Sequence, residues 1–123
     1  MKKLISISLI VLLGLFQACK EEVMCTEEFR AVGISVIGDS LTNFYTVRNS
    51  NLDTIKFPNN IEYSSNHWYP VLDDNYQSKI ANSQESFKFI GEINDTIVVN
   101  EVYVINADDC HINKVSGKSE VVL

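Results

Sequence analysis

The residues best suited to chemistry gather near the end of the chain, where Cys110 and His111 are neighbours. A thiol beside an imidazole can act as a nucleophile when the thiol is free and activated. Asp108 and Asp109 come directly before the pair and add carboxylates that acid–base or metal chemistry uses. Adjacent residues of a strand point to opposite faces, however, so this spacing argues against a thiol enzyme.

Metal-ligand residue types are present, but their spacing does not complete a site. A zinc site at 108–111 needs further ligands at a set spacing, and His67 is the only other histidine. The acidic pairs at 73–74 and 108–109 could hold calcium, although neither lies in an EF-hand pattern. The chain also has no glycine-rich phosphate loop. We therefore expect no catalytic residue, no metal and no cofactor.

Aromatic side chains gather in the middle of the chain, where Tyr63, Trp68 and Tyr69 lie close together. Exposed rings with polar tips suit the binding of a glycan or a peptide. The alternative is that Trp68 belongs to the core and that the tyrosines cover sheet edges. These three residues are the candidate binding surface.

The N-terminus has the composition of an export signal. Lys2 and Lys3 precede an apolar run from Leu4 to Phe16. The run is shorter than the roughly 20 residues that a spanning helix needs, and it suits a signal-peptide core. The run ends at Phe-Gln-Ala-Cys, which resembles a bacterial lipobox, although the Phe and Gln depart from the usual residues. The resemblance implies that Cys19 is lipidated and becomes the first residue of the mature chain.

The residues after Cys19 are Lys-Glu-Glu, which resembles the export signal of surface lipoproteins of the Bacteroidota type. We expect the protein at the bacterial outer membrane, held there by lipid and exposed on the surface, with the periplasmic face as the alternative. The expected organisation is a lipoprotein signal peptide over 1–18, a polar tether over 19–27 and one domain over 28–123.

Lipidation of Cys19 would leave Cys25 and Cys110 as an even pair in a compartment where disulfides persist. We expect these two to be bridged, with two unpaired thiols as the alternative. The chain carries a net charge of −6, and the loss of Lys2 and Lys3 makes it more negative. Such a surface repels phosphates, so we expect no nucleic-acid partner.

Short runs of β-branched and aromatic residues, separated by turn residues, predict strands through most of the domain. They fall at 29–37, 44–48, 52–57, 67–72, 86–93, 96–106, 111–115 and 119–123. Pro70 limits the fourth to an edge or a bulge. At most one short helix fits, around 74–81, with Asp74 as its cap. The pattern predicts an all-β protein, an antiparallel β-sandwich of about seven strands.

The stretches YPVLDD, FKFIGEI and YVINADDCHINKVSG resemble the last strands of small Bacteroidota-type lipoproteins with a carboxypeptidase regulatory-like or immunoglobulin-like domain. The D-x-x-G-x-P-V turn of that group is absent, and GDSLTN stands in its place. The resemblance implies a fold and a location, but no shared activity.

Three triplets share the order Asp, Ser or Thr, aliphatic residue, and their hydroxyl residues are Ser40, Thr54 and Thr96. They resemble the acceptor motif for general O-glycosylation of exported Bacteroidota-type proteins. A turn Asp followed by the start of a strand gives the same triplet without a sugar. These three positions are candidate glycosylation sites.

The expected function is that of a non-enzymatic, lipid-anchored binding or scaffolding module of the cell envelope, with membrane contact through Cys19 and a protein or glycan partner. One alternative is a small envelope enzyme or enzyme inhibitor with a minimal site near Asp108, Asp109 and His111. The other alternative is a purely structural envelope protein.

Overall fold

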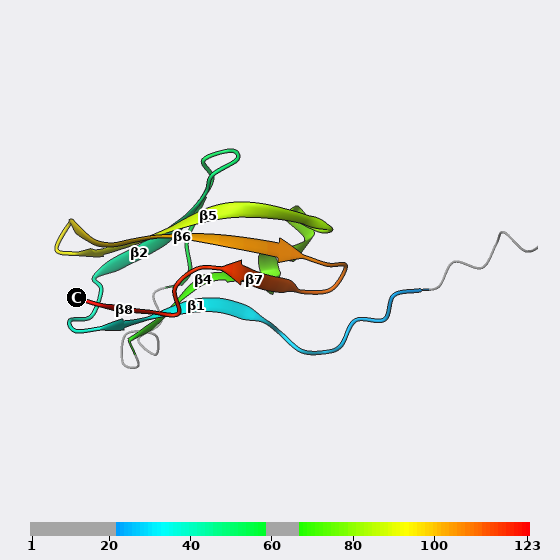
Figure 1. The fold of residues 1–123 in the computed structure, drawn as a ribbon, viewed down its shortest axis with the longest axis horizontal. Coiled ribbons are helices and arrows are strands. Elements are labelled where there is room, and N and C mark those ends of the chain that lie inside the picture. The colour runs from blue at the N-terminus through cyan, green and yellow to red at the C-terminus, as the bar shows by residue number, and fades with distance from the viewer. Residues whose placement is uncertain (1–21, 59–66) are drawn as a thin grey trace, which may run out of the picture.

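The structure is a computed structural model that describes residues 22–58 and 67–123. Its strands form two packed layers (Figure 1). The strands are β1 (Ala31–Ile37), β2 (Asn43–Arg48), β3 (Thr54–Ile55), β4 (Trp68–Asp73), β5 (Ser83–Ile93), β6 (Thr96–Ala107), β7 (Ile112–Ser116) and β8 (Glu120–Val122). One short helix, η2 (Asp74–Lys79), has 3₁₀ geometry. The expected all-β sandwich is confirmed.

One sheet has the order β4-β1-β8 and the other the order β3-β2-β5-β6-β7. All pairs between described strands are antiparallel except β1 with β8, which run parallel. The chain crosses from β7 in one sheet to β8 in the other, so no hairpin links β8 to its neighbour and sets an antiparallel direction.

Alternation along the strands builds the core between the layers. In β1, Val32, Ile34 and Val36 are buried while their neighbours are exposed or half-buried. A cluster of large aromatic rings from β4, β5 and β6 fills the centre, with the members Tyr69, Phe87, Phe89 and Tyr103. This alternation follows from the two-residue period of a strand with one face on the core.

Strand β4 lies at the edge of the three-stranded sheet, as Pro70 predicted. Its register with β1 shifts between Val32 and Gly33, at the level of Pro70. The buried hydroxyl of Thr46, from the opposite sheet, donates to the backbone oxygen of Val71 at 2.6 Å. A polar residue in the core is therefore satisfied by a carbonyl that the shifted register leaves available.

Two local predictions differ from the structure. The third strand spans only Thr54–Ile55, because Leu52 takes a φ of 61° and its N–H closes a turn onto the Arg48 oxygen at 2.8 Å. The cap of the short helix is Asp73, whose side chain accepts the Asn75 N–H at 3.0 Å. The prediction that Asp74 caps this helix is therefore wrong, and its carboxylate instead accepts hydrogen bonds from Arg30, His111 and Ile112.

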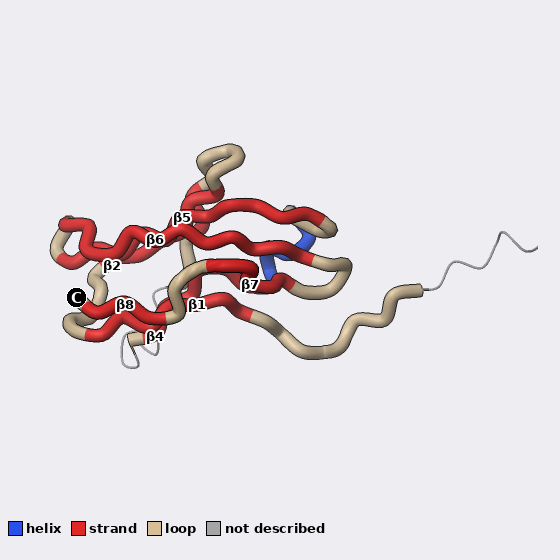
Figure 2. The backbone as a smooth tube through the Cα atoms, in the orientation of Figure 1, coloured by secondary structure: helices blue, strands red, loops and turns tan. Residues whose placement is uncertain are grey.

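The two ends of the sandwich differ. Figure 2 shows that the N-terminal segment leaves beside the short helix, whereas the C-terminus lies at the opposite end with the β5–β6 hairpin. The chain before β1 therefore enters the domain at one end of its long axis (Figure 1). Among residues 22–58 and 67–123, no helix has the length and apolar character to cross a membrane.

Candidate functional site

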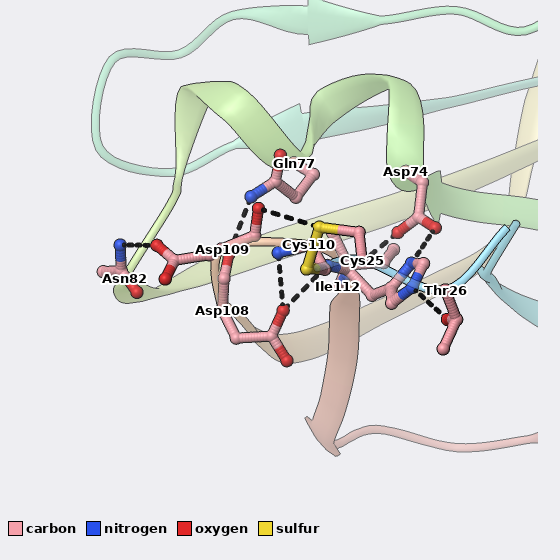
Figure 3. Close-up of a disulfide and its surroundings, with 10 residues drawn as sticks. Cys25, Thr26, Asp74, Gln77, Asn82, Asp108, Asp109, Cys110 and Ile112 are labelled. Atoms are coloured by element: carbon pink, nitrogen blue, oxygen red, sulfur yellow. Dashed lines mark hydrogen bonds and ion pairs between the residues drawn. A yellow bond between two sulfur atoms is a disulfide. The ribbon is translucent and has the colours of Figure 1, made fainter. Parts of the chain in front are cut away.

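A disulfide ties the segment before β1 to the turn between β6 and β7 (Figure 3). The sulfur atoms of Cys25 and Cys110 lie 1.98 Å apart and the Cα atoms 5.3 Å apart, with a sequence separation of 85. The expected pairing is therefore seen. Its place at the end of the sandwich fixes the N-terminal segment there.

The turn at 108–111 is built by Asp108. Its Oδ1 accepts the backbone N–H groups of Cys110 and His111, both at 2.8 Å. These two bonds lower the pKa of Asp108, with the His111 N–H as the larger cause. The side-chain amide of Gln77 also donates to the Asp108 backbone oxygen at 2.7 Å, so the helix supports the turn.

His111 is the centre of a hydrogen-bonded chain that joins three segments. Its Nδ1 lies 2.7 Å from Oδ2 of Asp74, and its Nε2 lies 2.9 Å from Oγ1 of Thr26. His111 is buried, with 7% of the residue exposed. Thr26 follows the bridged Cys25, so the segment before β1 is held at two consecutive residues.

Asp74 is a strong acceptor in this chain. It takes the backbone N–H of Arg30 at 2.8 Å and that of Ile112 at 2.9 Å, besides the histidine ring. Burial raises the pKa of Asp74, but the Arg30 N–H, the His111 ring and the Ile112 N–H together lower it below its ordinary value. Because an ionised carboxylate only accepts, Nδ1 of His111 donates to it. In the neutral ring, Nε2 is then the acceptor for the Thr26 hydroxyl.

Carboxylate, imidazole and hydroxyl follow one another here in the order that hydrolases use to activate a nucleophile. In chemical terms, Thr26 would attack and His111 would take its proton. Three cavities of the described structure lie at 28–33 with 112–114, at 55–58 with 72–79, and at 82–84 with 106–108, and Thr26 and His111 line none of these three. These contacts connect the segment before β1, the short helix and the β6–β7 turn.

The residues expected to form a minimal enzyme site are only partly brought together. The carboxylate of Asp109 binds the side-chain amide of Asn82 at 2.7 Å, and Oδ1 of Asp108 binds backbone N–H groups. His67 precedes β4, whereas Asp74 and the His111 ring lie beyond its other end. Within the described ranges, no group of three or more histidine, cysteine or acidic residues is placed to hold a metal.

The three aromatic residues expected to form a binding surface do not share one environment. Tyr63 lies outside the described residues. Tyr69 is a core residue at 1% exposure, and its hydroxyl accepts the Leu41 N–H at 2.9 Å, so it presents no ring to a ligand. Trp68 is half-buried, and its indole packs against Gly33, where an added Cβ would lie 2.0 Å from a ring carbon. Of the two described candidates, Trp68 and Tyr69, only Trp68 has exposed side-chain surface that a ligand could contact.

The candidate glycosylation sites lie at three different places in the fold. Ser40, Thr54 and Thr96 are all exposed. Ser40 lies in the β1–β2 loop, Thr54 begins β3, and Thr96 begins β6 after the turn at Asn94 and Asp95, which both have positive φ. Cys19 lies outside the described residues.

A groove of about 520 Å³ lies between β1 and β7. Its main polar group, the Arg30 guanidinium, donates to the Asn113 side chain at 2.6 Å and pairs with Glu28 at 3.2 Å. The Arg30 charge is therefore paired within the chain, whereas Lys114, which also lines the groove, donates to the Ser119 hydroxyl at 2.7 Å.

Sequence reasoning did not single out Thr26 or Asp74 as partners of His111. The signal was the cysteine pairing itself, because a bridge between residues 25 and 110 brings residues 26 and 111 side by side. No comparable signal identified Asp74, whose role depends on the placement of the short helix.

Comparison with known proteins adds no relative. No protein-family model matches the chain, and searches of curated proteins and of solved structures find no match either.

Proposed function

We propose that this chain is a lipid-anchored, non-catalytic binding or scaffolding module of a bacterial cell envelope, held at the outer membrane through Cys19 and displayed on the cell surface. The observation that carries the proposal is the fixed point at Cys25, where the N-terminal segment joins one end of the sandwich. A lipidated Cys19 would be six residues away, about 20 Å of extended chain at most.

This arrangement gives the domain a defined polarity toward the bilayer. The disulfide, the short helix and the β6–β7 turn form the end that a short tether keeps near the membrane. The β5–β6 hairpin and the β1–β2 loop form the far end, which is free to meet molecules outside the cell. A module that is firmly held at one end and open at the other suits binding or scaffolding.

A membrane-impermeant amine-reactive cross-linker applied to intact cells tests both display and binding. Exposed lysines, among them Lys56, Lys114 and Lys118, supply reactive amines. We expect labelling in intact cells and a recurrent cross-linked partner, with a periplasmic protein of the same cells unlabelled. Labelling only after permeabilisation would support the periplasmic alternative. Labelling without any partner would support the purely structural one.

A hydrolytic activity is a second candidate, favoured by the hydrogen-bonded chain of Asp74, His111 and Thr26. In that scheme the Thr26 oxygen forms a bond to the carbonyl carbon of an ester, and its proton passes to Nε2 of His111. The alcohol leaves with that proton, and water then hydrolyses the acyl-threonine. In this scheme the partners of His111 are Asp74 and Thr26, and not Asp108 and Asp109 as the sequence suggested.

Hydrolysis of p-nitrophenyl acetate separates the two candidates. The leading proposal predicts that wild type, Thr26→Ala and Thr26→Ser hydrolyse the ester at the same rate. A rate that falls at least tenfold in Thr26→Ala and is retained in Thr26→Ser, with unchanged circular dichroism, would favour the enzyme.

A further inference from the structure

A small cavity on the side of the sandwich is separate from the disulfide end. It has a volume of about 280 Å³ and lies between η2 and the chain at and after β3. Lys56 and Lys79 line it together with Tyr76. Its size is just below the usual range for small-molecule sites, about 300–1,000 Å³, so it suits a compact ligand. We call it the two-lysine pocket.

The charge of the two-lysine pocket is opposite to that of the chain. Both lysines are exposed, and neither ammonium group has an acidic partner within the described residues. Asp73 also lines the pocket, where it caps η2 by accepting the Asn75 N–H at 3.0 Å. Two lysines and one aspartate leave an excess of positive charge in a chain whose net charge is −6.

Arg48 and Lys118 of the domain are paired with acidic residues. Arg48 makes bonds of 2.7 Å and 2.5 Å to the carboxylate of Glu85, and Lys118 pairs with Glu101 at 3.1 Å. Lys88 and Lys114 also lack an acidic partner in the described residues, but neither of them lines this cavity. Two cations that share a cavity without such partners therefore attract an anion from outside.

The walls of the pocket add apolar surface. Ile55 and Phe57 line it and are partly buried against the core. The Tyr76 ring forms another wall, and the Lys79 ammonium lies 4.8 Å from its centroid, within the range of a cation–π contact. The Arg48 guanidinium lies 5.8 Å from the Tyr76 ring centroid, and it is held by the Glu85 carboxylate at 2.7 Å. A ligand here meets two cations and an apolar or aromatic surface.

We propose that the two-lysine pocket binds small organic carboxylates, with the carboxylate at Lys56 and Lys79 and an apolar body against Ile55 and Phe57. This inference rests on the proposed role of the domain as a binding module and names the class of ligand. It does not depend on the lipid anchor, because the residues proposed to bind the ligand all lie in the described domain.

Amide NMR titration of the purified protein with phenylacetate tests the proposal. We expect saturable shifts concentrated at residues 55–58 and 72–79. Phenylacetamide, which has the same ring and no charge, should bind at least tenfold more weakly. Because the carboxylate–ammonium contacts are the main attraction, Lys56→Gln and Lys79→Gln should each weaken phenylacetate binding about tenfold.

Lys88→Gln is the matched control, because Lys88 lies on β5, outside the pocket, and also has no acidic partner in the described chain. Its affinity for phenylacetate should equal that of wild type. The proposal is overturned if shifts do not saturate, if they scatter over the surface, or if all three lysine variants lose affinity equally. Such a failure would leave the membrane anchor untouched, and a failure of lipidation would leave this titration unchanged.

Discussion

Nδ1 of His111 lies 2.7 Å from Oδ2 of Asp74 and so joins the β6–β7 turn to the start of the short helix. The same ring contacts Thr26 through Nε2, next to the bridge at Cys25. A polar contact and a covalent bond therefore fix the N-terminal segment at adjacent positions. The proposed orientation of the domain toward the bilayer depends on this pair of attachments.

Asp74→Asn should lower the free energy of unfolding by about 2–3 kcal/mol at neutral pH, because a neutral amide replaces a buried carboxylate that accepts three hydrogen bonds. Urea unfolding measures the change. Asp73→Asn is the matched control, since asparagine caps a helix as well as aspartate and the change should be below about 0.5 kcal/mol. Equal losses in the two variants would contradict the account.

The stability of wild type and of Asp74→Asn should also depend differently on pH. The pKa of folded Asp74 lies below the ordinary value of 3.8, so its charge adds stability above that pH. The contribution is lost as the pH falls from about 4 through the folded pKa. The stability difference between wild type and Asp74→Asn should therefore shrink in acid, whereas losses from Asp108 and Glu85 are shared by both proteins. A difference that stays constant from about pH 6 to pH 2 would refute this role.

Reduction of the bridge between Cys25 and Cys110 should cost about 4 kcal/mol of stability, because the bond closes a loop that spans a sequence separation of 85. Urea unfolding with and without reductant measures the loss. The Cys25→Ser, Cys110→Ser double variant should have the same free energy of unfolding as reduced wild type, and reductant should not change it. Thiol labelling of unreduced, denatured protein should find no free thiol at these positions, and two labelled thiols would disprove the bridge.

Gly33→Ala should destabilise the three-stranded sheet by about 1–3 kcal/mol, because the new Cβ would lie 2.0 Å from the Trp68 indole. The displaced ring should also change the tryptophan fluorescence, and Trp68 is the only tryptophan. Pairing Gly33→Ala with Trp68→Leu tests the cause. The glycine substitution should cost clearly less in the leucine background, and an undiminished cost would show that the ring is not responsible.

The exposed hydroxyls of Ser40, Thr54 and Thr96 are expected to carry an O-linked glycan at one or more positions. The intact mass of protein from its native host should exceed that of the lipidated polypeptide. Alanine substitution at all three should remove the excess, whereas Ser50→Ala, another exposed hydroxyl outside the triplets, should retain it. A native mass without any excess would identify the triplets as ordinary turns.

Local patterns predicted much of the fold. The alternation of Val32, Ile34 and Val36 identified the buried face of β1. Pro70 predicted an edge strand or a bulge, and β4 has both. These features follow from the period of a strand and the missing N–H of proline, so one stretch of sequence contains them.

Long-range contacts were harder to predict. Tyr69 looked suited to a surface, but its side chain points to the core face of β4 and its hydroxyl finds the Leu41 N–H. Nothing in the sequence indicated that Asp74 would contact His111, because the two residues are 37 positions apart in the chain. The parallel pairing of β8 with β1 likewise depends on a crossing between sheets that short-range patterns do not encode.

The most direct test of the central claim is the mass of the N-terminal peptide of the protein from its native host. The account predicts that the mature chain begins at Cys19 and that this residue carries a diacylglyceryl group. Cys19→Ser should remove the lipid mass and stop that processing. A mature chain that begins elsewhere, or a wild-type Cys19 without lipid, would contradict the proposal that this domain is held at the membrane by its N-terminus.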